Sequence, residues 1–65
     1  MNGTVRWYNK EHGFGFIAPV AGGLDIFVEE AGVIDPPLEK KQQVSFEIGK
    51  TECGEFGAVN VIKRF

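Results

Sequence analysis

The sequence predicts an all-β domain built as a small five-stranded antiparallel barrel. No window of about eleven residues repeats its apolar side chains at the helical spacing. Instead, five short segments rich in β-branched and aromatic residues are separated by turns containing Gly, Pro or Asn. The chain has 65 residues, which is enough for one domain, and we expect that domain to span residues 1–65.

The first three strands are expected at residues 3–9, 13–18 and 24–28. Residues 9–13 have the composition of a short hairpin turn, Pro19 ends the second strand, and Gly22-Gly23 marks the next turn. Residues 29–34 are too few for an independent helix, so a single helical turn is expected there.

The last two strands are expected at residues 43–48 and 56–62, joined by a polar loop. The longest connection, residues 35–42, contains Pro36-Pro37, which excludes a central strand and stiffens the crossing. Three hairpin-linked strands followed by one long crossing fit a Greek-key barrel of the OB-fold type, whose known use is oligonucleotide binding. An RRM fold would need two amphipathic helices, which the pattern excludes.

Stability must come from one small apolar core or from a second copy. The single Cys53 cannot form an internal disulfide, and no Cys/His cluster indicates a metal site. A monomer is expected, with a strand-exchanged dimer through the Pro36-Pro37 connection as the alternative. The predicted inward-facing residues are Val5, Ile17, Ile26, Val28, Val33, Val44, Phe46, Ile48, Val59, Val61 and Ile62.

Three phenylalanines suggest a binding surface. Phe14 and Phe16 lie two residues apart and therefore share a face of their strand, and Phe27 lies in the next strand. The flanking Gly13 and Gly15 carry no side chain that could cover the rings, which indicates a surface kept open for a flat ligand. Stacking a nucleobase on an aromatic ring is worth roughly 1–3 kcal/mol. The alternative is that the rings form core and the glycines mark a bulge.

The charge balance limits how such a surface could bind nucleic acid. Seven Lys and Arg residues against nine Asp and Glu residues give a net charge of −2. A binder that depends mainly on phosphate neutralisation would be basic. Attraction would therefore come from stacking, with local help from Arg6, Lys10 and His12.

Other classes of function find little support. There is no apolar region typical of a signal peptide and no apolar run as long as a membrane span, so a cytoplasmic protein without a membrane partner is expected. No nucleophile is paired with a base, so no enzyme, catalytic residue, cofactor or small-molecule substrate is predicted.

Five stretches along the whole chain match one known family in its order: Gly3-Thr-Val-Arg-Trp-Tyr-Asn9, Gly13-Phe-Gly-Phe-Ile17, Asp25-Ile-Phe-Val28, Val44-Ser-Phe-Glu-Ile48 and Ala58-Val-Asn-Val61. On these stretches the chain resembles the bacterial cold-shock proteins, each of which is a single cold-shock domain. This resemblance implies a five-stranded barrel that binds single-stranded RNA or DNA with low sequence preference, leaning towards pyrimidine-rich strands. It also implies a role as an RNA chaperone or as a modulator of transcription or translation.

The resemblance also implies site residues. Trp7, Phe14, Phe16 and Phe27 match the family's stacking aromatics. Arg6 and His12 stand where Lys is usual, Asp25 matches an acid that accepts a hydrogen bond from a base, and Tyr8 replaces a Phe. Phe56 lies in the last loop, where the family often contacts its ligand with a polar side chain.

Two of these positions remain open from the sequence. Strict alternation places Trp7 on the inner face with Val5, whereas the resemblance requires it to be exposed. Phe56 fits either an exposed contact residue or a ring buried under its loop.

The departures from the family pattern predict weaker binding. Glu29-Glu30 replaces the usual His-Phe, and the loop aromatic after the third strand is absent, leaving Pro37 and Leu38. Two lost stacks would cost about 2–6 kcal/mol, which is roughly one and a half to four decades of affinity. The alternative function is a diverged barrel whose aromatic and acidic face binds a protein partner or a second copy.

Overall fold

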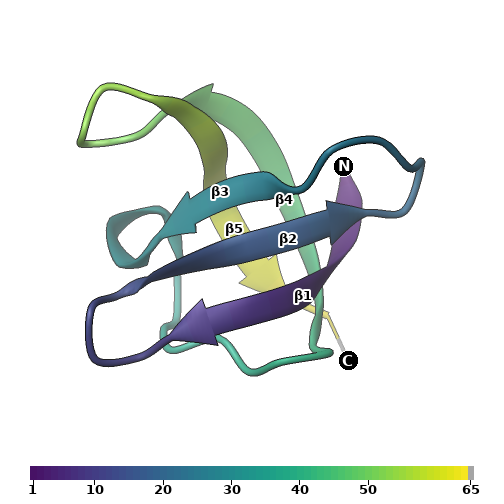
Figure 1. The fold of residues 1–65 in the computed structure, drawn as a ribbon, viewed down its shortest axis with the longest axis horizontal. Coiled ribbons are helices and arrows are strands. Elements are labelled where there is room, and N and C mark those ends of the chain that lie inside the picture. The colour runs from purple at the N-terminus through teal and green to yellow at the C-terminus, as the bar shows by residue number, and fades with distance from the viewer. Residues whose placement is uncertain (65) are drawn as a thin grey trace.

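The computed structural model describes residues 1–64, which form five strands and one short 3-10 helix (Figure 1). The strands close into a barrel in the order β1-β2-β3-β5-β4, which confirms the predicted five-stranded all-β barrel. No helix in these residues is long and apolar enough to cross a membrane. The elements are β1 (Asn2–Asn9), β2 (Phe14–Pro19), β3 (Ile26–Glu29), η1 (Glu30–Gly32), β4 (Gln43–Lys50) and β5 (Phe56–Lys63).

One contact in the barrel departs from the fully antiparallel prediction. β1 pairs antiparallel with β2 and β4, β2 with β3, and β4 with β5, but β3 and β5 meet in parallel at Val28 and Ala58. The long connection after η1 crosses below β1 and lets β4 pair with it (Figure 1). Since β5 then returns antiparallel to β4, it runs in the same direction as β3.

The barrel interior is filled by one apolar cluster, consistent with a single small core. Most of the predicted inward set is buried, but Ile48 and Ile62 are exposed, so those two predictions were wrong. Ile26 and Val59 are only half-buried. The buried residues are Val5, Ile17, Val28, Val33, Leu38, Val44, Phe46, Ala58 and Val61.

A local irregularity in β5 explains part of this difference. The register of β4 and β5 shifts between Ser45 and Glu47, where β5 carries an additional residue. Asn60 lies at this point with a φ of 51°, a left-handed conformation that Asn tolerates better than most residues. The bulge breaks the alternation, so Ala58 and Val61 are buried while Val59 is displaced from the core.

Leu38 anchors the long connection, a role that the sequence pattern did not indicate. Its side chain is 0% exposed in the core cluster. Just after it, the backbone N–H of Lys41 donates to the Val5 carbonyl at 2.7 Å, and the Val5 N–H donates to the Gln42 carbonyl at 2.8 Å. Leu38 is therefore a core residue of the connection and does not occupy the place of a lost surface ring.

We expect Leu38→Ala to lower the free energy of unfolding by about 2–5 kcal/mol, because it opens a cavity in a core this small. Leu24→Ala is the matched control, since Leu24 is 90% exposed, and it should change stability by less than about 0.5 kcal/mol. Urea denaturation followed by circular dichroism measures both. Equal effects would show that Leu38 does not pack in the core.

Candidate functional site

A β-bulge in β1 resolves the conflict at Trp7. Val5 pairs with Ile17 and Trp7 pairs with Phe16, so two steps along β1 match one step along β2. Arg6 is the additional residue, and it reverses the alternation. Val5 therefore points into the core, whereas the Trp7 side chain is exposed (44%) on the outer face.

The strand register then aligns aromatic rings across three strands. Trp7 lies opposite Phe16, and Phe16 lies opposite Phe27. The ring centroids are 6.4 Å apart for the first pair, which is stacked, and 6.0 Å apart for the second, which meets edge to face. Phe14 completes the group, 5.4 Å from Trp7 and 6.3 Å from Phe27. We call these four rings the ring surface.

The rings of this surface differ in exposure. Phe16 is 36% exposed, whereas Phe14 and Phe27 are half-buried by their neighbours. None of the four belongs to the core cluster. The alternative that the phenylalanines form core is therefore wrong.

The flanking glycines have a different role from the one expected. A Cβ on Gly15 would lie 2.2 Å from the Trp7 carbonyl oxygen, so Gly15 lets β2 approach the bulged β1 closely. Gly13 has a φ of +73° in the hairpin turn and donates its N–H to the Asn9 carbonyl at 2.7 Å. Both glycines are required by backbone geometry rather than by clearance of the ring surface.

Arg6 and Asp25, two predicted site residues, form an ion pair. Arg6 Nε lies 2.7 Å from Asp25 Oδ2, and the arginine side chain is 62% exposed. A pair this accessible to water contributes at most about 1 kcal/mol to stability. Its main effect is to hold the guanidinium of Arg6, the residue next to Trp7, in place.

The Lys10 and His12 side chains of the β1–β2 turn are exposed. The His12 backbone N–H donates to Asn9 Oδ1 at 3.0 Å, which fixes the turn and leaves the imidazole in solvent. Lys10 Nζ pairs with Glu39 Oε1 at 2.8 Å and ties this turn to the long connection. His12 therefore lies in the turn that joins the strands of Trp7 and Phe14, and the charge of Lys10 is compensated.

Phe56 is exposed (74%), which decides the alternative left open by the sequence. It lines a shallow hollow together with Phe16, Phe27 and the exposed Ile48, so the apolar surface continues past β3. A second hollow is lined by Phe16 and Leu24. Ile48 and Leu24 were not predicted to belong to this surface. The local sequence around each residue does not show which side chains lie next to it across the sheet.

Two carboxylates border the ring surface at the end of β3. Glu29 pairs in register with Phe14, and its Oε1 is buried without a hydrogen-bond partner. The Glu30 backbone N–H donates to the Gly13 carbonyl at 2.8 Å, which places this residue over the hairpin turn. Negative charge therefore lies at this end of the surface, as the sequence suggested.

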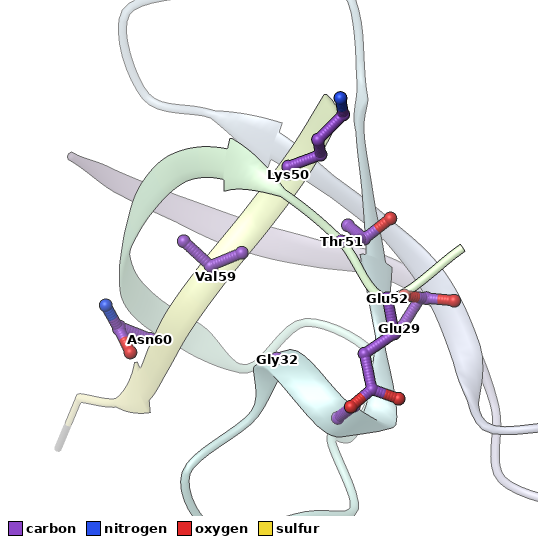
Figure 2. A pocket seen from close by; sticks show the side chains of 8 residues that line it. Glu29, Gly32, Lys50, Thr51, Glu52, Val59 and Asn60 are labelled. Carbon is purple, nitrogen blue, oxygen red and sulfur yellow. The ribbon is translucent and has the colours of Figure 1, made fainter. Parts of the chain in front are cut away.

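Glu29 also lines a small cleft of about 110 Å³ between η1 and the connection from β4 to β5 (Figure 2). Lys50, Thr51 and Glu52 enter from the β4 side, and Asn60 from β5. The lining carries charges of both signs, but the Lys50 ammonium points away from the carboxylates of Glu29 and Glu52 (Figure 2). Among residues 1–64, no group of three or more His, Cys, Asp or Glu side chains is placed to hold a metal ion.

Comparison with known proteins agrees with this geometry. A family model described as 'Cold-shock' DNA-binding domain matches residues 1–64. The chain belongs to the cold-shock domain family. Binding nucleic acid is the known role of that family, whose members are in general not enzymes.

Several curated relatives carry the same family name. A probable cold shock protein A of Mycobacterium tuberculosis is 51% identical over 55 residues, which cover 80% of this chain and 82% of the relative. Cold shock protein CspD of Bacillus subtilis is 46% identical and covers 97% of both chains. Cold shock-like protein CspB of Escherichia coli is 42% identical over 95% of this chain and 90% of its own.

Tyr8 of this cold-shock domain lies inward beside the ring surface, and its hydroxyl is buried without a hydrogen-bond partner. Burial raises the pKa of the Tyr8 phenol above its usual value of 10.0, and the negative charge of Glu30 raises it further. The folded chain therefore holds this proton more tightly than the unfolded chain. The resulting stabilisation is fully present below about pH 10 and is lost as the pH rises through the folded pKa.

Because Tyr8 is the only tyrosine, phenolate absorbance in a pH titration reports its pKa directly. We expect a midpoint above 10.0 in the folded protein. Glu30→Gln should lower this midpoint only in part, because burial is the larger cause. A midpoint at or below 10.0 while the fold persists would contradict the buried environment of the phenol.

Proposed function

We propose that this cold-shock domain binds single-stranded RNA or DNA by stacking unpaired bases on Trp7, Phe14, Phe16 and Phe27. The observation that carries the proposal is the ring surface itself, with centroids 5.4–6.4 Å apart across three adjacent strands. Successive bases of a flexible single strand fit such a row, whereas a duplex keeps its bases stacked on each other.

The chemistry of the surface supports low sequence preference. Every base has a π-face, so stacking tolerates any sequence. With a net charge of −2, the chain cannot rely on general attraction to phosphates, and stacking must supply most of the affinity. The family role and this chemistry together support the function of an RNA chaperone or a modulator of transcription or translation.

Polar side chains around the rings would orient the strand. Arg6 offers a planar cation next to Trp7, and the Asp25 carboxylate would accept a hydrogen bond from a base. His12 adds a donor at the turn. Phe56 extends the surface on the β5 side, where one further base would stack.

The carboxylates of Glu29 and Glu30 would make this domain a weaker binder than one with aromatic residues at both positions. Glu29 lies beside Phe14, where a nucleotide stacked on that ring would place its phosphate or the edge of its base. Repulsion from phosphates adds to the absent stacking, most strongly at low salt.

The direct test is Trp7 fluorescence during titration with a short oligo-U or oligo-dT. Trp7 is the only tryptophan and lies in the ring surface, so a stacked base will quench it. We expect the single strand to quench Trp7 fluorescence saturably. A hairpin duplex serves as the control. An unchanged signal with the fold intact by circular dichroism would overturn the proposal and favour a protein partner for the aromatic and acidic face.

We expect Phe27→Ala to weaken single-strand binding at least tenfold, because one stack is worth roughly 1–3 kcal/mol and about 1.4 kcal/mol is tenfold. It should cost less stability than Leu38→Ala, since Phe27 is half-buried. Ile62→Ala is the control, because Ile62 is exposed on β5 and lines neither hollow beside Phe16. Equal affinity of the two variants would exclude Phe27 as a stacking residue.

The double variant Glu29→His with Glu30→Phe should bind a single strand at least tenfold more tightly. It introduces the two rings usual in the family at these positions and removes two negative charges. Glu29→Gln with Glu30→Gln separates the charge effect from the added rings. Asp35→Asn with Glu47→Gln removes the same number of charges elsewhere on the exposed surface and should have the smallest effect. Unchanged affinity in the His/Phe variant would refute the proposed weakening.

A further inference from the structure

A basic hollow lies on the outer side of β1, next to the ring surface. It is lined by Arg6, Lys40 and Lys41 together with the small or uncharged residues Thr4, Val5 and Ala18. No acidic side chain lines it. The chain as a whole has a net charge of −2, so its overall composition does not explain this local concentration of positive charge.

The turn that carries the two lysines is held firmly against β1. Lys41 and Gln42 exchange backbone hydrogen bonds with Val5 at 2.7 and 2.8 Å. Within the turn, the Gln42 N–H donates to the Glu39 carbonyl at 3.1 Å, and Gln42 Oε1 accepts from the Glu39 N–H at 3.2 Å. The buried Leu38 fixes the segment from the inside. The lysine stems therefore project from a well-fixed backbone.

The lysines of this hollow carry uncompensated charge. Arg6 is paired with Asp25, and Lys10 is paired with Glu39, which removes the acid nearest in sequence to the lysines. Within the described residues 1–64, neither Lys40 nor Lys41 makes an ion pair. Two cations next to each other and exposed to solvent repel one another, and an anion bound between them would relieve this repulsion.

The hollow adjoins the ring surface through Arg6. This residue lines the hollow and directly precedes Trp7, the first ring of the row. A strand whose bases stack on Trp7 and Phe16 would reach this hollow if it leaves the rings across β1. Lysine ammonium groups bind phosphate oxygens as point charges, without reading base identity.

We propose that Lys40 and Lys41 form a phosphodiester-binding surface that holds the backbone of the single strand where it leaves the ring surface across β1. This inference rests on the proposed function and adds the path of the strand. The backbone lies towards the basic β1 side, away from Glu29 and Glu30 at the end of β3.

The test compares two double variants that remove the same charge. Lys40→Gln with Lys41→Gly removes the proposed contacts, and Gly suits position 41, where φ is 72°. Lys63→Gln with Arg64→Gln is the control, since neither residue lines the hollow or the hollows beside Phe16. Affinity for an oligo-U longer than the ring surface is measured by Trp7 quenching between about 50 and 200 mM salt.

The slope of log K against log[salt] should decrease by roughly 1.4 in the Lys40/Lys41 variant, because each phosphate contact on a single strand contributes about 0.7. The control variant should keep the wild-type slope. An unchanged slope in the Lys40/Lys41 variant, or an equal decrease in both variants, overturns this inference while leaving the proposed function standing. Absence of quenching in the wild-type protein would instead reject the proposed function.

Discussion

The β-bulge at Arg6 determines which face of β1 carries the indole ring, and the ring surface depends on it. Without the additional residue, Trp7 would follow Val5 into an interior that is already filled. With it, Trp7, Phe16 and Phe27 lie in register across three strands. Gly15 belongs to the same arrangement, because any side chain there would collide with the Trp7 carbonyl oxygen and force β1 and β2 apart. The bulge and the glycine together place aromatic groups outside the barrel, while a separate apolar cluster fills its interior.

The positions that sequence analysis assigned correctly are those determined by short-range pattern. Turn residues and alternating apolar residues defined five strands, and the crossing with Pro36-Pro37 defined the Greek key. The errors occur where one strand adjusts to another. The bulges at Arg6 and Asn60 are properties of strand pairs, so strict alternation placed Val59 in the core and left Trp7 undecided. Leu38 was missed because a single apolar residue in an irregular connection has no period to detect.

In the candidate site, too, the local sequence predicted some features, and only the folded structure showed the others. Residue types and spacing indicated Phe14, Phe16 and Phe27. The resemblance to the family supplied Trp7, Asp25 and Phe56, and it matched Arg6 and His12 to contact positions. Only the folded chain shows that Arg6 and Asp25 are partners, or that Ile48 approaches Phe56 and Phe27. Net charge is the least informative quantity here. A total of −2 describes a molecule with a cationic hollow beside β1 and carboxylates at the end of β3.

The buried oxygen of Glu29 has a consequence for the stability of the folded chain. Leaving such an acceptor without a donor costs about 1–3 kcal/mol of desolvation, which an isosteric hydrocarbon would avoid. For a 65-residue protein, whose free energy of unfolding is small, a cost of this size is a substantial fraction of the total.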